Sequence, residues 1–309
     1  MLQFIKDTNI DFLSKRKLAL MVSGAIILIG IAATIMHGGP DYSIDFLGGT
    51  ELHVRFSGTP QIGEIRSALA DIGFGNAEIK EFGAPQDILI RVEQQDTGAE
   101  ISQPILDTLS SQFASLSPEL LQRDIVGPRT GQELRTKTIW AIAIALILIL
   151  IYIWIRFEFV FGIGAVAALF HDVLITFGIF SLLRFEISLA VIAAFLTIVG
   201  YSLNDTIVVF DRIRENIKRL RREEFNKILN TSINQSLNRT VITSLTTLLV
   251  VLVLYLFGGE VLRNFSFALL VGVIIGTYSS VFIATPIVAE WQSRQIQKNA
   301  ALSAKKRKK

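Results

Sequence analysis

The chain has 309 residues, of which 51% are hydrophobic and 18% charged, with a mean hydropathy of +0.50 and a formal net charge of +3. Soluble domains carry about 25% charged residues. Here the apolar excess is concentrated in long runs, which is typical of a polytopic membrane protein. The sequence contains no cysteine, which excludes disulfides, thiolate metal sites and a cysteine nucleophile. Its three histidines leave no metal cluster, so we expect neither a metal nor a cofactor.

The first apolar run, residues 18–36, is predicted to span the membrane. Lys15-Arg16-Lys17 precedes it, as basic residues precede the apolar core of a signal peptide. The run is too long for such a core, however, and His37-Gly38-Gly39-Pro40 is a poor cleavage site. We therefore interpret it as a retained anchor, with residues 1–17 in the cytoplasm.

Residues 37–138 are predicted to form an α+β domain outside the membrane. Alternating apolar residues predict strands, and apolar residues at helical spacing predict helices. The segments in chain order are a strand at 50–56, a helix at 61–69, a hairpin of 77–82 and 88–93 with a turn-rich link at 83–87, a helix at 98–116 and a strand at 120–126. This β-α-β-β-α-β order is that of the ferredoxin-like, split βαβ fold, which by itself implies no chemistry.

Five further apolar runs bring the predicted membrane helices to six. They are residues 139–155, 159–183, 187–210, 241–257 and 265–289. Basic residues concentrate in the loop 211–240 and in the tail 290–309. Lys and Arg in short loops mark the cytoplasmic side, so both termini are predicted to be cytoplasmic and the domain 37–138 to lie on the opposite side.

The basic loop and tail admit two interpretations. Clusters of Lys and Arg can bind nucleic acid, but no RNA-binding motif accompanies them here. Basic residues next to membrane helices also set topology and contact anionic lipids. We favour this second interpretation and expect anionic lipids, and no nucleic acid, at the cytoplasmic face.

Ionisable residues inside a predicted span are costly and therefore candidates for function. Asp205 lies in the fourth span, about 8 Å from its cytoplasmic end at 1.5 Å per residue. Burial disfavours the charged carboxylate, so this group can exchange protons near neutrality. Ser202, Asn204 and Thr206 give this segment extra hydrogen-bonding capacity, and Asn204 and Thr206 are candidates for a polar path beside Asp205. Asp205 as a proton carrier is the favoured hypothesis; the alternative is a neutral acid that hydrogen-bonds a neighbouring helix.

Besides Asp205, three ionisable residues lie in or next to the predicted spans, and the sequence allows two roles for each. Arg239 precedes the fifth span, as an interfacial charge or as a partner of Asp205. His171 and Asp172 lie in the middle of the third span, and as neighbours they point about 100° apart, so we expect them not to share a helix face. In one interpretation Asp172 lines the same polar path as Asp205, with His171 capping it toward the cytoplasm. In the other the two make helix–helix hydrogen bonds with no transport role; the sequence favours neither.

Two groups of glycines are assigned to structure. Gly272, Gly276 and Ser280 form a stripe of small residues for close packing, against another chain or the fourth span. Gly48-Gly49 is followed by a strand and lacks the Lys-Ser/Thr of a phosphate loop. We interpret it as a turn at the entrance of the domain.

Two stretches resemble one family. Residues 41–50, DYSIDFLGGT, resemble the GIDFxGGT signature of SecD and SecF proteins, and contain Asp45, Gly48, Gly49 and Thr50. Residues 199–216 are similar to the fourth-span signature of the SecF branch, and contain Asp205, Asp211 and Arg212. Residues 10–12, His171-Asp172 and 238–240 are similar as well. The resemblance covers nearly the whole chain.

The resemblance implies a non-enzymatic role in protein export. Members of the SecF branch pair with SecD in a twelve-span unit of the resistance-nodulation-division superfamily, often with YajC, in the bacterial inner membrane. The unit assists the SecYEG channel and the SecA ATPase in late, periplasmic-side steps of exporting unfolded preproteins. The proton motive force drives it, and the matching residues here are Asp205 and Arg239.

Two alternatives belong to other classes. A small-molecule or lipid exporter of the same superfamily would usually have twelve spans and two outside domains. A non-transporting scaffold would use Asp205 only for packing. A membrane enzyme ranks last, because this Asp has no second intramembrane Asp at a suitable motif and no nucleophile–base set accompanies it.

Overall fold

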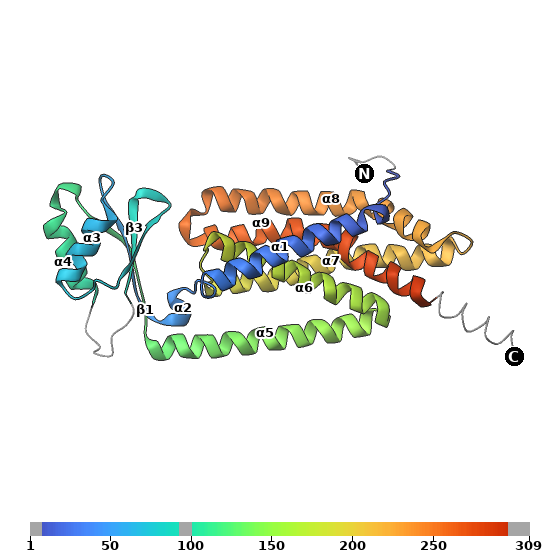
Figure 1. Ribbon diagram of the computed structural model, residues 1–309, viewed down its shortest axis with the longest axis horizontal. Coiled ribbons are helices and arrows are strands. Elements are labelled where there is room, and N and C mark those ends of the chain that lie inside the picture. Colours follow the sequence, from blue (N-terminus) through green and yellow to red (C-terminus); the bar gives the residue numbers. More distant parts are fainter. Residues whose placement is uncertain (1–7, 93–100, 296–309) are drawn as a thin grey trace. The chain divides into compact units, whose positions relative to one another are not determined.

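The computed structural model describes residues 8–92 and 101–295, and the chain divides into two compact units (Figure 1). The sheet domain comprises Tyr42–Ala141 together with Ile187–Leu189. The helical bundle comprises the residues up to Asp41, Ile142–Glu186 and the residues from Ala190 onward.

The sheet domain has the predicted β-α-β-β-α-β order. Its elements are β1 (Gly49–Arg55), α3 (Ile62–Asp71), β2 (Glu78–Phe82), β3 (Ala84–Val92), α4 (Ser102–Gln112) and β4 (Glu119–Val126), preceded by the short helix α2 (Ile44–Leu47). The strand order is β2-β3-β1-β4, with antiparallel neighbours throughout. Because β3 lies between β1 and β2, the split βαβ arrangement is confirmed.

One face of this sheet forms an apolar core with the two helices. Leu52 and Ile90 from the central strands are fully buried, together with Ile65 of α3 and Ile105 of α4. Burial of each such side chain contributes about 1.5–3 kcal/mol. The apolar periodicity that predicted strands and helices is therefore the pattern that holds the domain together.

The hairpin is tighter than predicted. The expected link 83–87 is mostly strand, because β3 begins at Ala84 and Phe82 pairs directly with it. Gly83 alone makes the reversal, at φ +84°, a conformation that glycine adopts without steric cost. The predicted helix 98–116 is shorter, with α4 followed by a 3₁₀ turn at Ala114–Leu116. Its expected first residues, 98–100, and the expected strand residue Glu93 lie outside the described residues.

Within the described residues, six helices are long and apolar enough to cross a membrane. They are α1 (Arg16–Met36), α5 (Pro128–Arg156), α6 (Phe159–Leu183), α7 (Leu189–Arg219), α8 (Phe225–Phe257) and α9 (Gly259–Ser279), which continues through the π-helical segment Ser280–Ala284 to residue 295. The predicted six-helix membrane architecture is confirmed.

The segment 211–240, expected as a loop, is helical over most of its length. The helix α7 continues to Arg219 and α8 begins at Phe225. Buried residues such as Ile213 and Leu229 pack between these extensions, and Asn216 donates to Ser232 at 2.9 Å. The extensions are amphipathic, so a search for uniformly apolar runs ends the spans too early.

Small residues allow close helix contacts inside the bundle. A Cβ atom at Gly272 would lie 2.2 Å from Ile198 Cγ1, and one at Gly276 would lie 3.0 Å from Ser202 Cβ. Both partners belong to α7, so the predicted stripe packs against the fourth span, one of the two partners considered. Ser280, its third member, begins the π-helical segment.

Candidate functional site: a buried polar network in the bundle

Asp172 on α6 joins three helices through its carboxylate. The side chain is 1% exposed. It accepts hydrogen bonds from Ser202 of α7, and from Ser279 of α9 at 2.8 Å. Ser279 directly precedes the π-helical segment, a distortion that is frequent at functional sites. Helix–helix hydrogen bonding, one of the two alternatives for Asp172, is therefore present.

His171 extends this network to α1. Its Nδ1 lies 2.9 Å from the Asp172 carboxylate, although we expected these neighbouring residues not to share a face; the imidazole is long enough to turn back. Its Nε2 lies 2.9 Å from Ser23 Oγ of α1. Ser23 lies 3.1 Å from the Tyr278 hydroxyl of α9, which donates to the carbonyl of Ala19 at 2.9 Å.

Asp205 is buried on α7, three residues after the Ser202 that binds Asp172, and it faces α8 and α9. It is 2% exposed. Its Oδ2 accepts long contacts from Ser244 at 3.5 Å and Thr277 at 3.4 Å, and these two hydroxyls lie 2.7 Å apart. Because these contacts exceed ordinary O–H···O distances, Asp205 is held more loosely than Asp172.

Asp172 and Asp205 are linked through shared helices. On α7, Ser202 binds Asp172 and lies three residues before Asp205; on α9, Thr277 contacts Asp205 and lies two residues before Ser279. A shift of either helix therefore acts on both carboxylates.

The other residues predicted to act with Asp205 do not bind its carboxylate in the described part of the chain. Arg239 of α8 is exposed and forms no ion pair with Asp205 there. Asn204 is exposed on the outer side of α7. Thr206 is buried but donates to the backbone carbonyl of Ser202 at 3.1 Å. Neither Asn204 nor Thr206 hydrogen-bonds Asp205.

The signature residues near position 45 organise the start of the sheet domain. Asp45 accepts a hydrogen bond from the backbone N–H of Leu189 at 2.9 Å, at the first residue of α7. Gly48 and Gly49 have φ of +75° and +136°, which agrees with the predicted turn. Thr50 follows in β1, paired with Val92 and Ile125.

The fourth-span signature ends in ion pairs. Asp211 pairs with Arg156 at the end of α5, and Arg212 pairs with Glu215 at 2.9 Å. The first pair joins α5 to the extension of α7, and the second lies within α7.

Sequence reasoning missed the hydroxyl residues that complete the network. Ser23, Ser244, Thr277, Tyr278 and Ser279 each hydrogen-bond within the bundle. The available signal was a hydroxyl side chain inside an otherwise apolar span, which tends to face a neighbouring helix. In residues 8–92 and 101–295, no group of three or more metal-ligating His, Asp or Glu side chains is found.

Comparison with known proteins decides the family. The model for the C-terminal part of the protein-export membrane proteins SecD and SecF matches residues 106–294. The chain belongs to the SecD/SecF family. A protein translocase subunit SecF of Rhodothermus marinus is 46% identical over 310 residues, covering 98% of this chain and 100% of that protein. A SecF subunit of Magnetococcus marinus is 44% identical, covering 97% and 98%.

Solved SecDF structures have the same fold. The crystal structure of SecDF from Thermus thermophilus, described as a translocon-associated membrane protein, matches with a TM-score of 0.84 and 38% identity. It covers 93% of this chain, which spans 39% of that SecDF chain. A SecDF structure in a super-membrane-facing form matches with a TM-score of 0.70 and 38% identity, covering 97% of this chain and 41% of that one.

The resemblance seen in the signatures is thus confirmed. This SecF-type chain is a multi-pass membrane protein and an accessory subunit of the Sec protein translocase. Its family is one of transport components rather than enzymes.

Proposed function

We propose that this chain forms the SecF half of a SecD–SecF complex that uses the proton motive force to promote late steps of preprotein movement through SecYEG, after SecA has acted. The SecDF matches support a SecD partner, because this chain spans only about two-fifths of each. YajC is a further expected partner. The six helices and one outside domain also argue against a self-contained exporter, which would need about twice as many.

Asp205 is the proposed proton-coupling residue, and its environment is the observation that carries this role. Among the described residues, two hydroxyls contact this carboxyl at 3.4–3.5 Å, and at 2% exposure no strong partner there commits it to one protonation state. Arg239 is proposed as its basic counterpart, as the family resemblance implies. Each proton that crosses supplies about 2.3 kcal/mol per 100 mV.

His171 and Asp172 are proposed to hold a second proton between them. The Tyr278 hydroxyl hydrogen goes to the carbonyl of Ala19, so Ser23 serves as donor toward Tyr278. His171 Nε2 must then donate to Ser23, which leaves one further proton between Nδ1 and the Asp172 carboxylate. The pair is thereby neutral as a unit, as its burial requires.

The helix α7 is the proposed mechanical link. It begins at Leu189, which Asp45 of the sheet domain binds, and reaches Asp205 about 24 Å further on, at 1.5 Å per residue. A helix is stiff over this length, so a shift caused by protonation at Asp205 moves the start of α7 as well. The sheet domain would in this way pass the change to the emerging preprotein.

We further propose the bacterial inner membrane as the location, with both termini in the cytoplasm and the sheet domain in the periplasm. The basic residues around the connection between α7 and α8 support this orientation. They also suit contacts with anionic lipids at the cytoplasmic face.

The test is the export of a trapped preprotein in cells depleted of the native subunit and supplied with Asp205→Asn. The expected result is loss of the gradient-dependent part of release, with assembly unchanged. The matched control is Thr246→Ala, an exposed residue of α8 that hydrogen-bonds only within its own helix. Unchanged release with Asp205→Asn would favour the scaffold alternative.

A further inference from the structure

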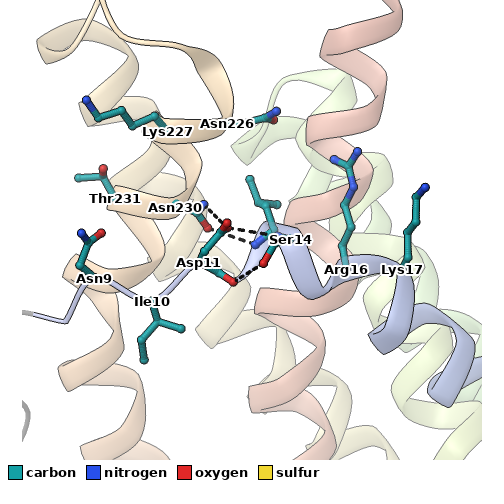
Figure 2. Close-up of a pocket in the computed structure, with 11 residues that line it drawn as sticks. Asn9, Ile10, Asp11, Ser14, Arg16, Lys17, Asn226, Lys227, Asn230 and Thr231 are labelled. Atoms are coloured by element: carbon teal, nitrogen blue, oxygen red, sulfur yellow. Dashed lines mark hydrogen bonds between the residues drawn. The ribbon is translucent and has the colours of Figure 1, made fainter.

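A polar pocket of about 700 Å³ lies where the N-terminal segment meets the first turns of α8. Figure 2 shows its two walls: Arg16 and Lys17 at the start of α1 with Ser14 in the 3₁₀ turn before it, and Asn226 and Lys227 on α8. These residues belong to one compact unit, the helical bundle.

Two asparagines of α8 hold the N-terminal wall in place. Asn230 Oδ1 accepts from the backbone N–H groups of Phe12 at 3.1 Å and Leu13 at 3.2 Å. Asn234 accepts from the N–H of Ile10 at 3.0 Å and donates to its carbonyl at 2.9 Å. A pocket whose walls are joined in this way is formed before any ligand arrives, which lowers the entropy cost of binding.

The charge of the pocket favours an anion. Arg16 and Lys17 form no ion pair in the described part of the chain, and Figure 2 shows both side chains pointing to the same side. The one acid among the described lining residues, Asp11, is engaged through its Oδ1: Asn230 donates to it at 2.7 Å, and the Ser14 N–H at 3.2 Å. These bonds lower the pKa of Asp11, so it stays charged while it is held in the wall of the pocket.

The surface beside the pocket identifies the kind of anion. From Lys17 onward, α1 exposes apolar side chains, among them Leu18 at 60% and Met21 at 64%. A free anion gains nothing from such a surface, whereas the acyl chains of a lipid do. Paired basic residues at the end of a membrane helix attract anionic headgroups.

We propose that this pocket binds the phosphate of an anionic phospholipid, with the acyl chains along the exposed apolar face of α1. Arg16 and Lys17 hold the phosphate, and Ser14 and Asn226 are placed to hydrogen-bond the headgroup. The site deepens the lipid contact included in the proposed function, and rests on the chain being a membrane protein with this end at the anionic leaflet.

The experiment measures lipid binding by the purified full chain in detergent, using native mass spectrometry with phosphatidylglycerol and with phosphatidylcholine of the same chain length. The test variant is Arg16→Gln/Lys17→Gln. The matched control is Arg221→Gln/Arg222→Gln, which removes two charges from the exposed connection between α7 and α8, outside the pocket. A charge-keeping variant, Arg16→Lys/Lys17→Arg, checks that loss of binding is not loss of folding.

The expected result is about a thirtyfold loss of phosphatidylglycerol binding in the test variant only, with phosphatidylcholine weak throughout. Equal losses in the test and control variants would overturn the site in favour of general surface attraction. Displacement of the lipid by excess inorganic phosphate would show a free-anion site and overturn the lipid assignment. Because binding is measured without export, failure here is distinct from failure of the proton-coupling proposal.

Discussion

The carboxylate of Asp45 accepts a hydrogen bond at 2.9 Å from the backbone N–H of Leu189. A residue 144 positions earlier in the chain therefore provides the acceptor for the first N–H group of α7. The N–H groups of a first helical turn have no partner within the helix, and a carboxylate there also complements the helix dipole. Residues Ile187–Leu189 belong to the sheet domain, and the rest of α7 belongs to the bundle. The Asp45–Leu189 contact therefore lies within the sheet domain, at the first residue of the helix that carries Asp205.

Asp45→Ala is expected to destabilise the start of α7 by about 1 kcal/mol, as loss of a helix cap does. Asp45→Asn keeps an acceptor oxygen and should lose less. Hydrogen exchange of the backbone amides at residues 189–192 measures the effect directly. Export should fall in the same order if α7 transmits the movement; faster exchange with unchanged export would contradict that link.

Asp172→Asn is expected to lower the stability of the protein more than Asp205→Asn does. The Asp172 carboxylate is bound by Ser202, Ser279 and His171, so the change leaves buried donors unmatched and should lower stability by about 1–3 kcal/mol. Asp205→Asn disturbs only two long contacts and should leave stability nearly unchanged while it abolishes gradient-dependent export. Thermal unfolding in detergent, measured together with export, separates the two variants. Equal losses of stability in both would contradict this prediction.

Gly276→Val is expected to separate α9 from α7. Even a methyl at this position would lie 3.0 Å from Ser202 Cβ, and overpacking of this kind costs about 1–3 kcal/mol. The same movement would pull Ser279 from Asp172. Gly200→Ala is the control, because no heavy atom lies within 4 Å of an added Cβ there. Thermal unfolding of the two variants checks the contrast, and an equal Tm for both would count against the packing.

The sheet domain is expected to lose stability in acid through Asp87. Arg55 donates to this buried carboxylate at 2.7 and 2.8 Å, which lowers the pKa of Asp87 below its ordinary 3.8. The pair therefore stabilises the folded domain fully above the unfolded pKa, and this contribution falls as pH drops below about 4. Asp87→Asn should flatten that part of the profile.

Urea unfolding of the full chain in detergent, followed by the circular dichroism of the strands between pH 3 and 7, measures this dependence. Glu81→Gln, at an exposed residue of β2, is the control and should keep the acid-side slope. A wild-type profile that is flat below pH 4 would contradict the role of the Arg55–Asp87 pair.

The architecture of the molecule was predictable because it follows from local patterns. Apolar length predicted six spans, and α6 begins and ends where its apolar run does, at Phe159 and Leu183. Alternation predicted β1, and Gly48-Gly49 predicted the turn. In each case the residues that form the pattern are neighbours in sequence and belong to the helix, strand or turn that they predict.

Partnership between distant residues was not predictable in this way. The sequence singled out Asp172 and Asp205 because a carboxyl in an apolar run is costly wherever it lies. It did not show that Ser202 and Ser279 satisfy one of them while Ser244 and Thr277 only loosely contact the other. It also placed Asn204 on the polar path, although helix geometry turns that residue outward.

The sequence alone thus determined that this chain crosses a membrane six times, carries one split βαβ domain and holds rare carboxyls inside its spans. Only the tertiary structure decided which hydroxyls surround each carboxyl, that Asp45 binds Leu189 and that the N-terminal segment closes a basic pocket against α8. The physical reason is that hydrophobic periodicity is a property of one helix or strand, whereas a buried hydrogen bond depends on how two helices pack. That packing is set by small residues such as Gly276, whose partners lie far away in the chain.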